Sequence, residues 1–65
     1  MKRYAIYRKA GGKITKPPLG TIESDEKIYI LKEASFFVIV GMTSETKEEF
    51  SGKYPDLTVN EVVQY

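Results

Sequence analysis

Two short apolar runs in the middle of the chain constrain its fold more than any other feature. The first run is Ile28–Leu31, the second is Phe36–Val40, and the segment Lys32–Ser35 separates them. Both runs are rich in aromatic and β-branched residues, which suit the pleated surface of a sheet. Two such runs joined by a short polar segment predict a β-hairpin, which we place at about residues 27–42.

The strands of this hairpin are apolar on both sides. In the second run, Phe36, Val38 and Val40 alternate with Phe37 and Ile39. A sheet with one face in water should instead alternate between apolar and polar residues. We therefore expect both faces to be covered, one by a helix and the other by a second layer, the C-terminal segment or another copy of the chain.

The N-terminal segment, residues 2–9, has the alternation of a strand. Tyr4 and Ile6 would face the core, and the opposite side would be basic and aromatic. Gly11 and Gly12 permit a tight turn. A short return strand at residues 14–15 would then complete a basic β-ribbon over residues 1–16.

The segment that follows the ribbon contains two adjacent prolines, Pro17 and Pro18. Proline cannot donate a ladder hydrogen bond, so it is excluded from the middle of a sheet. We therefore predict an extended connector or an edge over residues 16–20, followed by a short strand at residues 21–23.

A short peripheral helix is predicted at about residues 44–51. Thr43 or Ser44 can cap its N-terminus, and Gly52 fits the left-handed residue that ends many helices. Phe50 is the one clearly apolar residue of this segment, so a single aromatic side chain should anchor the helix.

The C-terminal segment fits two structures. Thr58 and Glu61 have the spacing of a capping box that would begin a helix, whereas Leu57, Val59 and Tyr65 fit a strand. We favour the helix. The predicted fold class is α+β: a small antiparallel sheet of three to five strands, one short peripheral helix, and a short C-terminal helix or strand.

The length of 65 residues predicts one small domain, with the ribbon at 1–16 and a body at 19–65. Domains of this size usually need a disulfide, a structural metal or a partner chain. The chain has no Cys and no His, which removes disulfides and the ligands of nearly every structural zinc site. We therefore expect a homodimer.

The same two absences argue against catalysis. Without His or Cys there is no conventional triad and no thiolate nucleophile, and the acidic residues fall in predicted turns and on the exposed helix. Gly12 and Lys13 resemble the end of a phosphate-binding loop, but Ile14 stands where Ser or Thr is needed and Tyr7 where the first glycine is needed. We expect no enzyme, no cofactor, no metal and no small-molecule substrate.

Charge is distributed unevenly along the chain. Residues 1–16 hold six cations and no acid, a charge of +6, and residues 17–65 hold four lysines and nine acids, a charge of −5. A basic arm on an acidic body is the most informative feature for function. The six cations are Lys2, Arg3, Arg8, Lys9, Lys13 and Lys16.

The first functional hypothesis is a small regulatory protein that binds nucleic acid through this basic ribbon. Cations would contact phosphates, and Tyr7 would stack on a base. The cations in question are Arg3, Arg8, Lys9 and Lys13. Two other interpretations stay open: an ordinary solvated edge strand that discourages sheet pairing, and a surface for an acidic protein.

The second hypothesis is an assembly or interaction subunit that uses an apolar sheet face. Tyr29, Phe36 and Phe37 would be its anchors, because aromatic residues often dominate interfaces. The N-terminus lacks the apolar segment of a signal peptide, and Phe36–Met42 is far too short to cross a membrane. We therefore expect a soluble, cytoplasmic protein.

Overall fold

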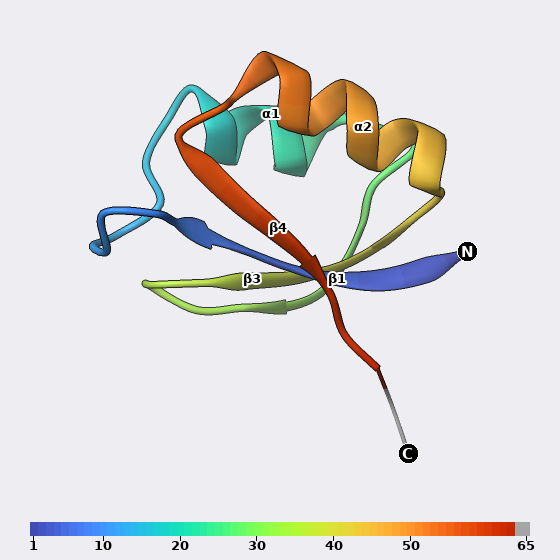
Figure 1. Cartoon of the computed structure of the whole chain (residues 1–65), viewed down its shortest axis with the longest axis horizontal. Coiled ribbons are helices and arrows are strands. Elements are labelled where there is room, and N and C mark those ends of the chain that lie inside the picture. The colour runs from blue at the N-terminus through green and yellow to red at the C-terminus, as the bar shows by residue number, and fades with distance from the viewer. Residues whose placement is uncertain (64–65) are drawn as a thin grey trace.

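The computed structural model describes residues 1–63, which form a four-stranded antiparallel sheet with two helices on one of its faces (Figure 1). This confirms the predicted α+β class. The elements, in chain order, are β1 (Lys2–Arg8), α1 (Pro18–Ser24), β2 (Tyr29–Glu33), β3 (Val38–Met42), α2 (Ser44–Lys53) and β4 (Leu57–Glu61).

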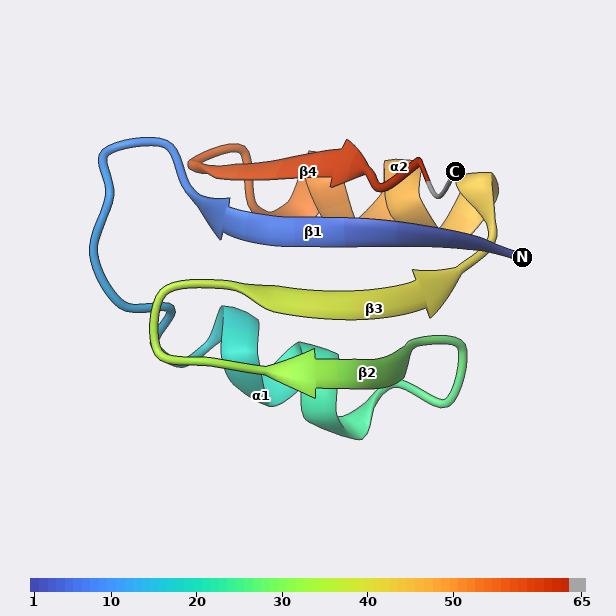
Figure 2. The same cartoon turned by 90° about the horizontal axis from the view of Figure 1, so that it is seen from below.

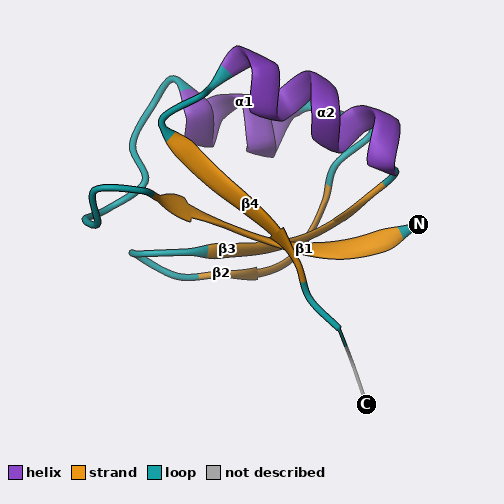
Figure 3. Ribbon diagram, in the orientation of Figure 1, coloured by secondary structure: helices purple, strands orange, loops and turns teal. Residues whose placement is uncertain are grey.

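The strands lie in the order β2-β3-β1-β4, and every neighbouring pair is antiparallel. The chain therefore runs β-α-β-β-α-β, with β3 inserted between the parallel strands β1 and β2. This split βαβ connectivity is that of ferredoxin-like folds. Figure 3 shows both helices on the same side of the sheet, so the opposite face carries no helix.

The core lies between the sheet and the two helices. Ile6 and Val40 contribute from the sheet and Ile22 from α1, all with no exposed surface. Phe50 of α2 is 3% exposed and packs its ring at 5.1 Å from that of Tyr54. Burying an aliphatic or aromatic side chain of this size is worth about 1.5–3 kcal/mol, so each of these side chains stabilises the packing of the helices on the sheet.

The predicted hairpin is formed by β2 and β3. The amide of Ala34 donates to the carbonyl of Phe37 at 2.9 Å and closes the turn. The pairing register shifts between Ile30 and Lys32, so Leu31 is an extra residue in a β-bulge. Such a bulge on an edge strand discourages pairing with another sheet.

Helix α2 agrees with the prediction at its start and differs from it at its end. The hydroxyl of Thr43 accepts a hydrogen bond from the amide of Thr46 at 3.2 Å, which is the expected N-cap. Gly52 was predicted to end the helix, but it lies inside it. The last turn instead closes with the amide of Tyr54 donating to the carbonyl of Phe50, and Pro55 prevents continuation.

The prediction of a connector and a short strand over residues 16–23 is wrong, because Pro18–Ser24 is helix α1. Pro18 lies at the first helical position, where its fixed φ suits the helix. An N–H at this position makes no hydrogen bond within the helix, so proline loses none there. Ile22 then falls one turn further along and is completely buried. Burial of that side chain anchors a helix too short to be stable alone.

The predicted β-ribbon is also wrong. Residues 9–17 form a loop, and β1 pairs with β3 on one side and β4 on the other. Ile14, expected in a return strand, is instead buried beside the hairpin turn, where its amide donates to Ser35 at 3.3 Å. Because β1 is central, the interpretation of its charges as edge protection fails as well.

The preference for a C-terminal helix is wrong, and the alternative strand is correct. Strand β4 pairs with β1 at five positions, with Leu57 buried and Val59 against the core. Tyr65, part of that predicted strand, lies outside the described residues. Neither helix in residues 1–63 has the length and hydrophobicity that a membrane crossing requires.

Candidate functional site on the open sheet face

The side of the sheet away from α1 and α2, here called the open face, is covered by no other element of residues 1–63 (Figure 2). Directly paired residues share a face of a sheet, so the registers define its rows. One row is Tyr29, Gly41 and Arg3; the next is Lys32, Ile39, Ala5 and Asn60; the third contains Tyr7 and Thr58. The expected second cover is therefore absent from the described part of the chain.

Tyr7 presents an aromatic ring on this face. The side-chain amide of Asn60, on β4, donates a hydrogen bond of 2.7 Å to its hydroxyl. The side chain remains 36% exposed, whereas Tyr4 on the helix side is 3% exposed. The predicted division of these two tyrosines between core and surface is confirmed, and the ring of Tyr7 is held in place by its neighbour.

A shallow groove of about 410 Å³ lies at the other end of β1, over Gly41. A Cβ atom at Gly41 would stand 3.3 Å from the Sδ of Met1 and 3.9 Å from the Cδ1 of Leu31. A glycine inside a strand often marks a place where another group approaches the backbone closely. The groove is lined by Met1, Lys2, Arg3, Tyr29, Leu31 and Gly41.

The acidic side chains of residues 1–63 are confined to the helix side and the turns of the molecule, which also carry Lys2, Arg8, Lys47 and Lys53. The open face carries Arg3 and Lys32, and no carboxylate side chain from residues 1–63 shares it. Glu33 pairs with Val38 and Glu61 with Tyr4, which puts both acids on the helix side. The remaining acids lie on the helices and in the turns beside them: Glu23, Asp25, Glu26, Glu45, Glu48, Glu49 and Asp56.

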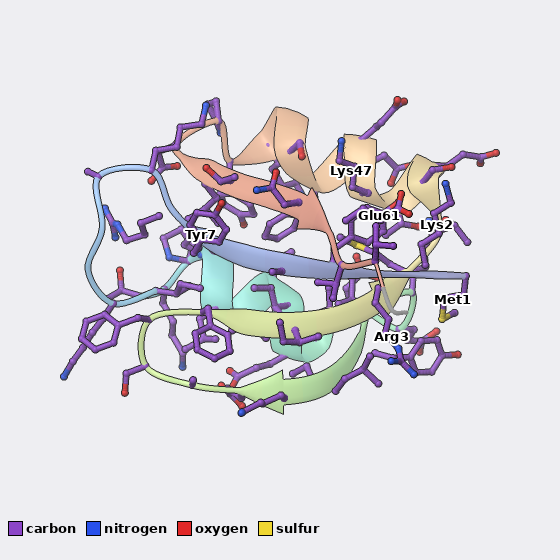
Figure 4. All side chains as sticks on the ribbon, turned by 60° about the horizontal axis from the view of Figure 1, so that its bottom comes forward. Met1, Lys2, Arg3, Tyr7, Lys47 and Glu61 are labelled. Atoms are coloured by element: carbon purple, nitrogen blue, oxygen red, sulfur yellow. The ribbon has the colours of Figure 1, made fainter. Side chains whose placement is uncertain are left out.

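The predicted nucleic-acid contacts do not form one cluster. Arg3 and Tyr7 both belong to the open face, at opposite ends of β1 (Figure 4). Arg8 belongs to the other side, where it lies 3.9 Å from the carboxylate of Asp56 and 3.5 Å from the hydroxyl of Thr15. Strand alternation separates Arg8 from Tyr7, so its grouping with them was incorrect.

Lys9 and Lys13 lie in the loop that follows β1, and both are exposed. Gly11 and Gly12 of this loop have φ values of 81° and 96°, which glycine adopts readily. The loop begins at the Tyr7 end of β1, so its lysines extend the positive charge beyond the sheet.

The three predicted interface aromatics are also separated. Tyr29 is 56% exposed and borders the groove, whereas Phe36 is 59% exposed in the hairpin turn. Phe37 is half-buried, with the ammonium of Lys32 5.8 Å from the centre of its ring. Of these three aromatic residues, only Tyr29 and Phe37 therefore belong to the open face.

Several residues of this face were missed from the sequence, among them Lys32, Asn60 and Gly41. The isolated glycine in an otherwise apolar strand is a signal that could have found Gly41. Lys32 follows a bulge, and the sequence favoured a helix around Asn60. Strand alternation therefore could not predict on which face of the sheet either residue lies. In residues 1–63 no three His, Cys, Asp or Glu side chains gather where they could hold a metal ion.

These features define a small α+β domain whose helix-free sheet face is cationic and aromatic. Comparisons with protein-family models, with curated protein sequences and with solved structures found no match to this chain.

Proposed function

We propose that the chain is a non-catalytic protein that binds single-stranded nucleic acid across its open face. The observation that carries this proposal is that the open face has cations and aromatic rings but lacks carboxylates. Two cations and two exposed tyrosines share a face with no carboxylate side chain from residues 1–63, while the acids lie on the helix side. The overall charge of +1 does not reveal that the acids avoid this face.

Each part of the face has a role in this proposal. Tyr7 offers a ring on which a base can stack, a contact worth about 1–3 kcal/mol per base. Arg3 and Lys32 attract the phosphates, and the loop residues Lys9 and Lys13 continue that attraction where the strand leaves the sheet.

A single strand fits this surface better than a duplex does. The bases of a duplex are stacked on one another, so their flat faces cannot reach Tyr7, whereas unpaired bases can be splayed onto the aromatic side chains of a sheet. The positive residues are spread over a flat face and one loop, and no helix of the described chain projects from that face into a groove.

The test is fluorescence anisotropy of labelled single-stranded and double-stranded oligonucleotides, titrated with the protein at about 50 mM and about 200 mM salt. Binding to the single strand should weaken with salt, with a log–log slope of about −0.7 for each phosphate contacted. The duplex should bind more weakly. Absence of single-strand binding at the lower salt would overturn the proposal.

A second candidate function is assembly with another protein or with a second copy of the chain. Strand β2 is an edge strand of the sheet, and on it Tyr29 and Leu31 are 56% and 54% exposed. Two open faces stacked together would bring like charges into contact, which costs several kcal/mol. A homodimer would therefore associate through the exposed side chains of Tyr29 and Leu31 without extending the bulged edge of β2. Light scattering over a range of concentrations tests this: a dimer that Leu31→Lys converts to monomer supports it, and a stable monomer contradicts it.

A further inference from the structure

We infer that the groove over Gly41 holds one unpaired base of the bound strand. This inference rests on the proposed function and adds to it, because the groove gives the site a contact with a base as well as with phosphates. It is separate from the ring of Tyr7, and it lies at the opposite end of β1.

The groove has the form that a flat, apolar ring requires. Its floor is the backbone of Gly41, which is itself buried although it carries no side chain. In the free chain the side chains of Met1 and Leu31 lie over this glycine, and both are more than half exposed, at 75% and 54%. A flexible thioether makes favourable contacts with aromatic rings, so we expect Met1 to move off the glycine and to contact the base that takes its place.

Charge around the groove favours a base that belongs to a strand. Arg3 pairs across the sheet with Gly41 and is one of the residues that line the groove, so a cationic side chain borders any ring held there. Lys2 also lines the groove, although its ammonium lies 3.4 Å from the carboxylate of Glu61. The phosphate of the nucleotide that carries the bound base would therefore lie near positive charge. An apolar side chain from another protein would gain no binding energy from this positive charge.

The groove and Tyr7 are too far apart to hold the same base. Arg3 and Tyr7 are four residues apart on one strand, which corresponds to about 13 Å at 3.3–3.4 Å per residue. The bound strand would thus follow β1, with one base over Gly41 and another on Tyr7. Its phosphates would pass Arg3 and continue towards the loop lysines.

The experiment compares a short single-stranded oligonucleotide with an oligonucleotide of the same length in which every residue is abasic. Both are titrated by anisotropy with the wild-type chain, with Gly41→Val, and with Gly52→Val as a matched control. Valine suits a strand, and the nearest atom to the new Cβ is the flexible end of Met1. Gly52 lies in α2 with nothing within 4 Å of its Cβ position. Circular dichroism verifies that each variant folds.

We expect the wild type to prefer the strand that carries bases. Gly41→Val should weaken binding of that strand by about tenfold, within the range for one stacked base, and leave abasic binding and Gly52→Val unchanged. If the wild type binds both strands equally, or if Gly41→Val keeps the full preference, the groove holds no base although the proposed function stands. If neither strand binds, the proposed function itself fails. If Gly41→Val leaves binding unchanged but alters the oligomeric mass measured by light scattering, the groove is a contact between two copies of the chain.

Discussion

The side-chain amide of Asn60 donates a 2.7 Å hydrogen bond to the hydroxyl of Tyr7, across the boundary between β4 and β1. The two residues are 53 positions apart in the chain, so this contact exists only once the C-terminal strand has paired. It fixes the aromatic ring on the open face and leaves that ring accessible. An intramolecular hydrogen bond of this kind contributes about 0.5–1.5 kcal/mol.

The ring of Tyr7, more than its hydroxyl, should determine binding. Tyr7→Ala should weaken binding of single-stranded oligonucleotides by about 1–3 kcal/mol, the value of one stacked base. Tyr7→Phe keeps the ring and loses only the bond from Asn60, so it should bind nearly as well as the wild type. Anisotropy titrations measure both variants, and equal binding by Tyr7→Ala and the wild type would show that no base stacks there.

The contributions of Tyr7 and Gly41 should be additive. Substitutions more than about 7–10 Å apart with no shared partner usually add within a few tenths of a kcal/mol, and these two positions belong to different rows of the sheet. The loss of binding free energy in Tyr7→Ala/Gly41→Val should equal the sum of the single losses. A double variant no weaker than either single variant would mean that both positions contact one base.

Ile22 should be indispensable to the fold. It is the buried residue at the centre of α1, with no exposed surface, and Ile→Ala substitutions in a core cost about 2–5 kcal/mol. The core of a domain this small rarely supplies more than about 3–5 kcal/mol of net stability. Ile22→Ala should therefore be largely unfolded by circular dichroism at 25 °C.

The milder change Ile22→Val is the control for that measurement. It should cost about 0.5–1.5 kcal/mol and leave a cooperative transition in urea. If Ile22→Ala kept the wild-type midpoint, α1 would not be held by this side chain.

The N-cap of α2 should be worth a measurable amount of stability. Thr43→Ala removes the acceptor for the amide of Thr46, and loss of such a cap costs about 1 kcal/mol. Ser44→Ala changes the neighbouring exposed residue and makes no such loss, so it is the matched control. Urea unfolding should show a lower midpoint for Thr43→Ala alone, and equal midpoints would argue against the cap.

The parts of this fold that depend on local pattern could be predicted from the sequence. Alternation placed Tyr4 inside and Tyr7 outside, the two apolar runs predicted the hairpin, and a polar cap followed by Phe50 predicted α2. Each of these features is encoded within a few residues. The α+β class followed from them.

The parts that depend on distant pairing could not be predicted in this way. Strand β4 exists because β1 offers a partner for residues 57–61, which outweighed a local helix signal at Thr58. The central position of β1 depends on the same pairing. Helix α1 was missed for a different reason: the two prolines predicted an extended connector or an edge, although proline is also favoured at the first position of a helix, where Pro18 lies.

The candidate site was predicted only in part, for the same reasons. Arg3 and Tyr7 were found because they alternate with core residues on one strand. Lys32 and Asn60 join them only through the sheet order and a bulge. The absence of acids from the open face is likewise a property of the topology, because the acids are scattered along residues 17–65 of the sequence.

The central claim is that the open face binds the strand, and neutralising its cations tests it most directly. Arg3→Gln/Lys32→Gln is compared with Lys47→Gln/Lys53→Gln, which removes the same charge from α2 on the other side of the sheet. Anisotropy titrations with a single-stranded oligonucleotide give the salt dependence of each. The open-face variant should lose affinity and reduce the log–log slope by about 1.4, or 0.7 for each lost phosphate contact, while the α2 variant keeps the wild-type slope. Equal losses in the two variants would contradict the claim, because binding would then follow net charge and not this face.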